Sequence, residues 1–232
     1  MIYLFPGRER GYVDHGWLRA FYTFSFADYH DRTRLGFRAL RAINEGWLSP
    51  GCSYGEHPHA DVEILTYTLD GMLKHEDSLG HVALAGRGQV QYLSAGRGVI
   101  HNEINPSGTT TTHFLQVWIL PERPGLPPHY ETREFPRDGR ESAWRLIGGP
   151  RPAKGAGPIH QDVEAFVAVL APDTPLAHTF KADRHGWVQL LRGNAHANGT
   201  LLQAGDGASI SAEQTLTIVA SQRAELVLFD LA

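Results

Sequence analysis

Apolar residues in this chain form short alternating or continuous runs of four to eight residues, bounded by turn residues. The clearest runs are Val62–Leu69, Val90–Leu93, His113–Leu120, Val163–Leu170, Val188–Leu191, Leu216–Val219 and Glu225–Phe229. They are rich in β-branched and aromatic side chains, which pack well on a pleated sheet. Turns such as Asp70-Gly71 and Arg192-Gly193-Asn194 separate them. The pattern predicts an antiparallel all-β protein, with helix limited to a turn or two near Asp28–Thr33.

One sequence pattern occurs twice and predicts two domains. In each copy an apolar strand ends in a glycine, a hairpin with a histidine follows, and an Ala-Gly-x-Gly turn comes next; Gly71 thus corresponds to Gly193, and Gly86 to Gly205. Such a repeat is typical of two copies of one structural unit. We place the domains at residues 1–125 and 159–232. Residues 126–158 are predicted to be a connector, because the stretch from 121 to 158 holds eight of the 14 prolines, which central strands exclude.

Composition and charge narrow the class of protein. A hydrophobic fraction of 42% and a charged fraction of 20% are typical of a globular chain and exclude wholesale disorder. The net charge of −4 disfavours direct binding to DNA or RNA, which requires a basic surface. The single cysteine, Cys52, excludes an internal disulfide and a multi-cysteine zinc site. The sequence offers neither a signal peptide nor a membrane-spanning run, so we expect a cytoplasmic protein.

Histidine is the unusual component, with 13 residues. His57-Pro58-His59 is the one His-x-His motif, and on a strand its two imidazoles point to the same face. Such a short motif also arises by chance, and then marks two solvated histidines near a turn. His101-x-Glu103 has the same spacing and follows the turn Gly96–Gly98. A second His-x-Glu, at His129 and Glu131, lies beside two prolines in the predicted connector and is treated as incidental.

The two motifs fall in one repeat unit, so a hairpin could bring three imidazoles and a carboxylate together. This ligand set suits a transition metal such as Fe, Mn, Co, Ni, Cu or Zn, whereas Ca²⁺ and Mg²⁺ prefer oxygen ligands. It also leaves one or two coordination positions open, as a catalytic metal requires.

These residues resemble a known family. Gly51-x5-His57-x-His59-x3-Glu63 and Gly98-x2-His101-x3-Asn105 look like the two cupin motifs. The segments 24–29, 36–45, 57–67, 71–80 and 94–103 resemble the pirin family, and specifically its bacterial members similar to quercetin 2,3-dioxygenases. General cupins place a proline where this chain has Gly96, and often use as a ligand the glutamate that corresponds to Glu63. Because Glu63 shares strand parity with His57 and His59, it is kept as an alternative fourth ligand. Its structural interpretation is a strand-face residue that pairs with an arginine or holds a ligand imidazole.

The resemblance implies a bicupin, with two antiparallel β-barrel or jelly-roll domains facing each other. It also implies one mononuclear metal in the N-terminal domain, usually Fe(II), with Zn, Ni, Mn, Co or Cu as alternatives. By position, the ligands would be His57, His59, His101 and Glu103.

Other residues have a structural and a functional interpretation. His75, near Asp77 and Ser78, is expected to tie a hairpin, with a substrate contact as the alternative. His113 could line the pocket, and Cys52 is expected to be a packed small residue. An aromatic cluster is expected to form core and inter-domain packing and not a stacking platform; it comprises Phe21, Tyr22, Phe24, Phe26 and Tyr29.

The second repeat is predicted to be metal-free. The repeat offsets place Thr179, Lys181, Ala220 and Gln222 where the first copy has its four ligands. These residues cannot replace three imidazoles and a carboxylate. The histidines of the second half, His178, His185 and His196, lack the metal-binding spacing.

The resemblance implies an enzyme, a dioxygenase that opens the ring of a flavonol such as quercetin with O₂ and releases carbon monoxide. The metal would bind the deprotonated 3-hydroxyl, and Glu103 would accept its proton as a base. The expected partners are a small aromatic substrate and O₂, with the chain a monomer. Two alternatives stay open: an iron-binding regulatory protein acting through protein contacts, as eukaryotic pirins do, and a non-redox cupin such as an isomerase.

Overall fold

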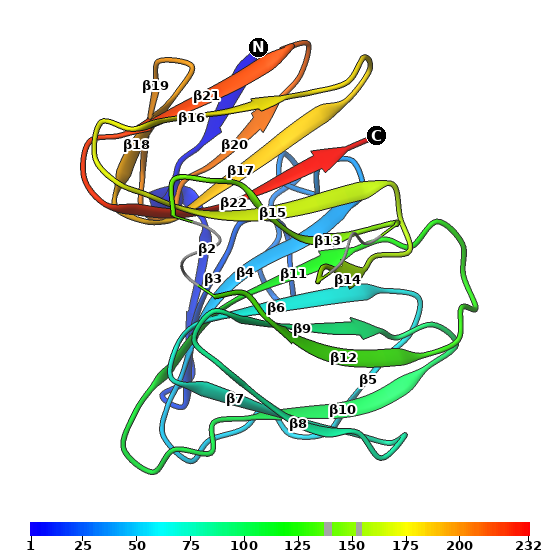
Figure 1. Cartoon of the computed structure of the whole chain (residues 1–232). Coiled ribbons are helices and arrows are strands. Elements are labelled where there is room, and N and C mark those ends of the chain that lie inside the picture. Colours follow the sequence, from blue (N-terminus) through cyan, green and yellow to red (C-terminus); the bar gives the residue numbers. More distant parts are fainter. Residues whose placement is uncertain (137–140, 152–154) are drawn as a thin grey trace. The chain divides into compact units, whose positions relative to one another are not determined.

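The computed structural model describes residues 1–136, 141–151 and 155–232, and these form two compact units (Figure 1). The first-half unit comprises Gly11–Glu134 with Ile159–Gln161, and the second-half unit comprises Met1–Arg10, Phe135–Pro158 and Asp162–Ala232. Within the described residues the one helix is a 3₁₀ turn, η1 (Gly7–Glu9). The all-β prediction is confirmed, whereas the helical turn expected near Asp28–Thr33 is wrong. None of the described helices is long and apolar enough to cross a membrane.

The first-half unit is a jelly-roll-like pair of antiparallel sheets. The seven-stranded sheet has the order β12-β9-β6-β11-β4-β3-β2. Its strands are β2 (Gly11–Asp14), β3 (Leu18–Tyr22), β4 (Leu40–Leu48), β6 (Glu63–Asp70), β9 (Gln89–Ser94), β11 (Thr112–Ile119) and β12 (His129–Glu134). The four-stranded sheet has the order β5-β10-β7-β8. Its strands are β5 (His57–His59), β7 (Met72–Asp77), β8 (Val82–Gly86) and β10 (Val99–Ile104).

The second-half unit repeats this arrangement. Its seven-stranded sheet has the order β1-β20-β17-β22-β15-β13-β14 and its four-stranded sheet the order β16-β21-β18-β19. The large sheet contains β1 (Ile2–Phe5), β13 (Arg145–Gly149), β14 (Gly157–Pro158), β15 (Val163–Leu170), β17 (His185–Arg192), β20 (Gly207–Ile210) and β22 (Ala224–Leu231). The small sheet contains β16 (Pro175–Thr179), β18 (Asn194–Ala197), β19 (Thr200–Gln203) and β21 (Thr215–Ala220). β6-Gly71-β7 and β17-Gly193-β18 occupy matching places, so the two copies inferred from the sequence are both all-β units of one design.

The structure divides the chain differently from the expected domain boundaries. The first ten residues belong to the second-half unit, because β1 pairs along its length with β20. The expected connector also contains three strands, β12, β13 and β14. Its prolines are compatible with these strands because β12 and β14 are at sheet edges, and β14 alone contains one, Pro158.

Each unit has its own apolar core. In the second-half unit the core between the sheets contains Val188, Leu216 and Ile218, all fully buried. In the first-half unit Leu48, Leu73 and Phe114 pack between the sheets at one end of the sandwich. The space between the two sheets of the first-half unit is therefore only partly apolar, and polar side chains occupy the rest.

Candidate metal centre

Strand β5 carries His57 and His59 along the edge of the four-stranded sheet, beside β10. Pro58 between them has no N–H to donate, which an edge position tolerates. In the β5–β10 register His57 lies opposite His101, so imidazoles from both strands emerge on one face. The His-x-His and His-x-Glu motifs thus meet on neighbouring strands.

Strand β10 begins at a turn that only glycine fits. Gly96 has a φ of +47°, and a Cβ atom there would lie 2.0 Å from the carbonyl oxygen of Leu126. Proline, which fixes φ near −65°, could not adopt this conformation. This backbone conformation explains why the chain has Gly96 where general cupins have a proline. At the other end of β10, Asn105 Nδ2 donates to the carbonyl oxygens of Leu48 and Thr110 at 2.9 and 2.8 Å.

Three imidazoles converge in the first-half unit. One ring nitrogen from each of His57, His59 and His101 lies within 4.8 Å of the others. The ring centroids are 4.5 Å apart for His57 and His101, and 4.9 Å apart for His59 and His101. His57 Nδ1 is 2.9 Å from the carbonyl oxygen of Gly55, so it donates there and leaves Nε2 free as a ligand atom.

Two of the three histidines, His59 and His101, are held in the neutral form. Burial, together with the neighbouring His57 and His59, lowers the pKa of His101 to about 2. Burial also lowers the pKa of His59 to about 4. His101 Nε2 is buried and has no hydrogen-bond partner within the described residues. A buried lone pair without a donor is costly, and a metal ion bound among the three imidazoles would satisfy it.

Glu103 lies two residues along β10 on the same face as His101, fully buried. Gln116 Nε2 donates to its Oε2 atom at 2.7 Å, and Thr66 Oγ1 donates to Oε1 at 3.4 Å. Trp118 Nε1 donates to Gln116 Oε1 at 3.1 Å and thereby fixes which way the amide points. Burial nevertheless raises the pKa of Glu103 to about 7, against the effect of these hydrogen bonds. A nearby cation would favour the ionised form.

Glu63, the alternative ligand, lies elsewhere. Its Oε1 accepts a hydrogen bond from Ser94 Oγ at 2.7 Å, and its Oε2 lies 3.1 Å from His160 Nδ1. It alternates along β6 with Thr66, which reaches Glu103, so it points to the other face of the sheet. The strand parity with His57 and His59 does not extend to Glu63, because Asp61 between β5 and β6 has a φ of +51°.

Two other candidates are also placed away from the cluster. His113 Nε2 is 2.9 Å from Glu45 Oε1, and its ring stacks on Trp47 with centroids 4.3 Å apart. It lies three residues from Gln116 on β11, so strand alternation places it on the opposite face. Cys52 packs beside the Leu48 and Phe114 core, consistent with a small packed residue. His75 does bond Asp77 at 3.0 Å, as expected for a hairpin tie, but it also contacts His101.

Part of the aromatic cluster reaches the site. Phe26 packs edge-to-face on Trp118 with centroids 5.0 Å apart, and Trp118 packs edge-to-face on His59 at 4.8 Å. Tyr22 in turn contacts Phe26 at 5.2 Å. An aromatic wall made of Phe26 and Trp118 therefore stands beside one imidazole of the three-histidine cluster. Sequence reasoning missed Trp118 and Gln116 as site residues, although their spacing on the strand after the His-x-Glu motif was a usable signal.

The second-half unit places other residues at the equivalent positions. His75 and Ala197 are equivalent, because each lies four residues after the hairpin glycine of its unit, Gly71 or Gly193. In the strand register Glu103 lies opposite His75, and Ile218 lies opposite Ala197. Leu216 and Ile218 therefore stand where the first unit has His101 and Glu103.

Opposite Leu216 lies His178, and Phe180 follows two residues later. The sequence-based equivalents Thr179 and Lys181 were wrong by one residue, and this shift turns each side chain to the other face. The equivalents Ala220 and Gln222 were wrong by four residues. His178 keeps an imidazole, but its Nε2 is 2.7 Å from Asp230 Oδ2. Within the described residues, the space corresponding to the metal site is thus largely apolar core.

Comparison with known proteins agrees with this architecture. The Pirin family model matches residues 6–119, and a model described as the quercetinase C-terminal cupin domain matches residues 146–231. The chain is 42% identical to quercetin 2,3-dioxygenase of Escherichia coli K12, over 100% of this chain and 99% of that protein. It is 38% identical to a pirin-like protein of Caulobacter vibrioides, over 98% of each chain. The crystal structure of the bacterial pirin YhhW from Escherichia coli with nickel(II) superposes with a TM-score of 0.95 at 42% identity, covering 100% of this chain and 99% of that one.

Proposed function

The chain belongs to the pirin family, and we propose that it is a metal-dependent dioxygenase that opens the ring of a flavonol such as quercetin with O₂. The observation that carries the proposal is the convergence of His57, His59 and His101, whose ring nitrogens lie within 4.8 Å of one another. A relative 42% identical to this chain contains nickel(II) in its crystal structure. We propose His57, His59, His101 and Glu103 as the ligands of one divalent ion, with Fe(II) as the native metal.

The metal and the chain would have separate tasks. A divalent, redox-active ion would lower the pKa of the flavonol 3-hydroxyl and couple the electron-rich ring to O₂. The three imidazoles would hold that ion, and Glu103 would take the hydroxyl proton when its carboxylate is free to do so. Gln116 and Thr66 would keep the carboxylate oriented through their hydrogen bonds to its two oxygens. Both atoms of O₂ would enter the product, and one ring carbon would leave as carbon monoxide.

The aromatic wall supports a planar aromatic substrate. Trp118 lies next to the proposed ligand His59, Phe26 packs on Trp118, and Tyr54 contacts His57 with ring centroids 6.2 Å apart. Aromatic surfaces of this kind favour edge-to-face or offset contacts with another ring. A flavonol could therefore be oriented by its rings while its 3-hydroxyl faces the metal.

Oxygen uptake with quercetin tests the proposal. Protein stripped of metal and reloaded with Fe(II) is expected to consume O₂ when quercetin is added and to release carbon monoxide. The same protein loaded with zinc is expected to consume none above the metal-free background, because Zn²⁺ has no accessible redox step. The measurement is an oxygen-electrode trace for matched metal contents, with carbon monoxide detected in the headspace.

Two results would contradict the proposal. Equal rates with iron and zinc would show that the metal has no redox role, as in an isomerase-type cupin. No uptake with any flavonol by fully metallated protein would favour the other hypothesis, an iron-binding regulatory protein that acts through protein contacts.

We expect one metal ion per chain, bound in the first-half unit. His178→Ala removes the imidazole that the second-half unit retains at a position equivalent to His57. The Nε2 atom of His178 is already hydrogen-bonded to Asp230. The variant should therefore keep the metal content of the wild type, measured by elemental analysis after purification without chelator. A fall by half or more would indicate a second metal at His178.

A further inference from the structure

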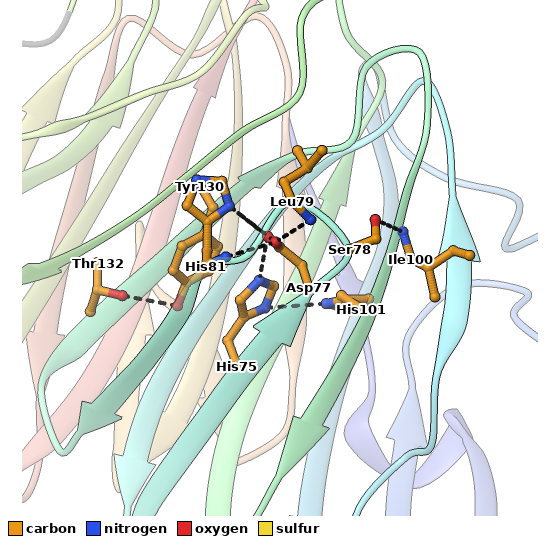
Figure 2. Close-up of polar contacts among 9 residues, drawn as sticks. All are labelled: His75, Asp77, Ser78, Leu79, His81, Ile100, His101, Tyr130 and Thr132. Carbon is orange, nitrogen blue, oxygen red and sulfur yellow. Dashed lines mark hydrogen bonds and ion pairs between the residues drawn. The ribbon is translucent and has the colours of Figure 1, made fainter.

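The ligand His101 is joined to a chain of polar groups that leads away from the metal site. His101 Nδ1 lies 3.3 Å from His75 Nδ1, and His75 Nε2 lies 3.0 Å from Asp77 Oδ2 (Figure 2). The same Asp77 oxygen is 2.8 Å from Nδ1 of His81, whose side chain is 42% exposed. The chain of contacts therefore begins at a buried imidazole and ends at the surface.

The direction of each hydrogen bond follows from Asp77. An ionised carboxylate can only accept, so His75 must carry its proton on Nε2. A neutral His75 then has a lone pair on Nδ1, so in the 3.3 Å hydrogen bond between the two rings His101 Nδ1 is the donor. With its proton on Nδ1, His101 has its lone pair on Nε2. That is the atom that is buried without a partner among the described residues.

Asp77 and His75, the two residues between His101 and His81, are held rigidly. Asp77 Oδ1 accepts hydrogen bonds from the backbone N–H groups of Leu79 and His81, at 2.9 and 3.0 Å. The ring of His75 stacks on Tyr130 from β12, with centroids 3.8 Å apart and planes 7° from parallel. Neither ring nor carboxylate can turn without losing these contacts.

We propose that Asp77 and His75 are positioning residues that fix His101 in its Nδ1–H tautomer, so that Nε2 is always available to bind a divalent metal. The proposal rests on the metal site proposed above. A free imidazole populates both tautomers, and one of them would present an N–H to the ion. Groups that hold a ligand histidine through its other nitrogen commonly contribute 10–100-fold to metal affinity.

The substitution Asp77→Asn tests this by reversing the direction of the hydrogen bonds from residue 77 through His75 to His101. The backbone donors of Leu79 and His81 should keep the amide oxygen at the Oδ1 position, which directs the amide NH₂ towards His75. His75 would then accept on Nε2 and donate from Nδ1. His101 would be driven to accept on Nδ1 and carry its proton on Nε2, the tautomer that cannot bind metal.

Glu76→Gln is the matched control. It removes the same charge one residue away, but the Glu76 side chain is 41% exposed and pairs with Lys74 on the other face of β7. If charge near the site were the cause, both variants would weaken metal binding. If the tautomer is the cause, only Asp77→Asn will.

Two measurements on each protein decide the matter. Long-range ¹H–¹⁵N spectra of the metal-free protein, labelled at histidine, report which ring nitrogen of His75 and His101 carries the proton. Competition with a chelator gives the dissociation constant for Ni²⁺. We expect His101 as the Nδ1–H tautomer in the wild type and in Glu76→Gln, with equal affinities within about twofold. We expect the Nε2–H tautomer in Asp77→Asn, with about 10–100-fold weaker binding.

A second variant covers a failure of Asp77→Asn to fold. His75→Phe keeps a ring against Tyr130 but offers no acceptor to His101, so His101 should show both tautomers and bind Ni²⁺ more weakly. Unchanged tautomers or unchanged affinity in whichever variant folds would overturn the proposal. A wild-type protein that shows the Nδ1–H tautomer but does not bind Ni²⁺ would instead overturn the proposed metal site.

Discussion

Glu103→Gln is expected to lower quercetin-dependent oxygen uptake by about 10²–10⁴-fold, the usual contribution of a positioned general base. Glutamine has nearly the shape of glutamate and retains one oxygen that could coordinate a metal, but it cannot accept a proton. Gln116 Nε2 donates to Oε2 in the wild type, and the glutamine oxygen can take over that contact. The rate is to be expressed per bound iron, so that any loss of metal does not count as loss of catalysis.

Glu63→Gln is the control for this experiment. Glu63 is as buried as Glu103, at 3% exposed, but its contacts are Ser94 and His160 and it lies on the other face of β6. We expect it to keep the metal content and the rate per iron, although it should unfold at a lower denaturant concentration because a buried hydrogen-bonded carboxylate is changed. Undiminished turnover in Glu103→Gln would remove Glu103 as the base. A large loss of metal or of turnover in Glu63→Gln, without a loss in Glu103→Gln, would indicate that Glu63 and not Glu103 is the fourth ligand.

The strands that form the site were predictable because their pattern is local. β6 and β11 are rich in aliphatic, β-branched and aromatic residues, and both correspond to segments expected from the sequence. The His-x-His and His-x-Glu spacings also needed only the two-residue period of a strand, and the structure brings their three histidines together. The edge strand β12 was missed because the prolines around it dominated the local signal.

The remaining features depend on register and on distant side chains, which spacing does not reveal. The position of His178 opposite Leu216 follows from the pairing of β16 with β21, and an error of one residue in the repeat alignment hid it. The contact between His75 and His101 likewise depends on β7 lying next to β10. Tyr130, which stacks on His75, comes from a strand more than fifty residues later in the chain. Sequence alone therefore identified the three converging imidazoles but not the groups that orient them.

His59→Ala is expected to abolish stoichiometric metal binding while leaving a folded protein. The variant removes one of three converging imidazoles, and the two that remain form a weaker, less complete site for a transition metal. The fold should survive because His59 lies on a three-residue edge strand, outside the cores around Leu48, Leu73 and Phe114. Truncation leaves a gap beside Trp118 but removes no ladder hydrogen bond, since alanine keeps the backbone N–H.

His113→Ala is the matched control, because His113 is a similarly enclosed imidazole of the same unit with a carboxylate partner, Glu45. Its ring stacks on Trp47, on the face of β11 away from the cluster, so its loss should weaken packing without touching the metal. Elemental analysis of protein purified without chelator should find one equivalent in the wild type and in His113→Ala, and almost none in His59→Ala. Circular dichroism should show the same strand content in all three proteins. Full metal retention in His59→Ala would mean that the ion is bound elsewhere, because a site that loses one of its three imidazole ligands cannot keep its affinity through the other two.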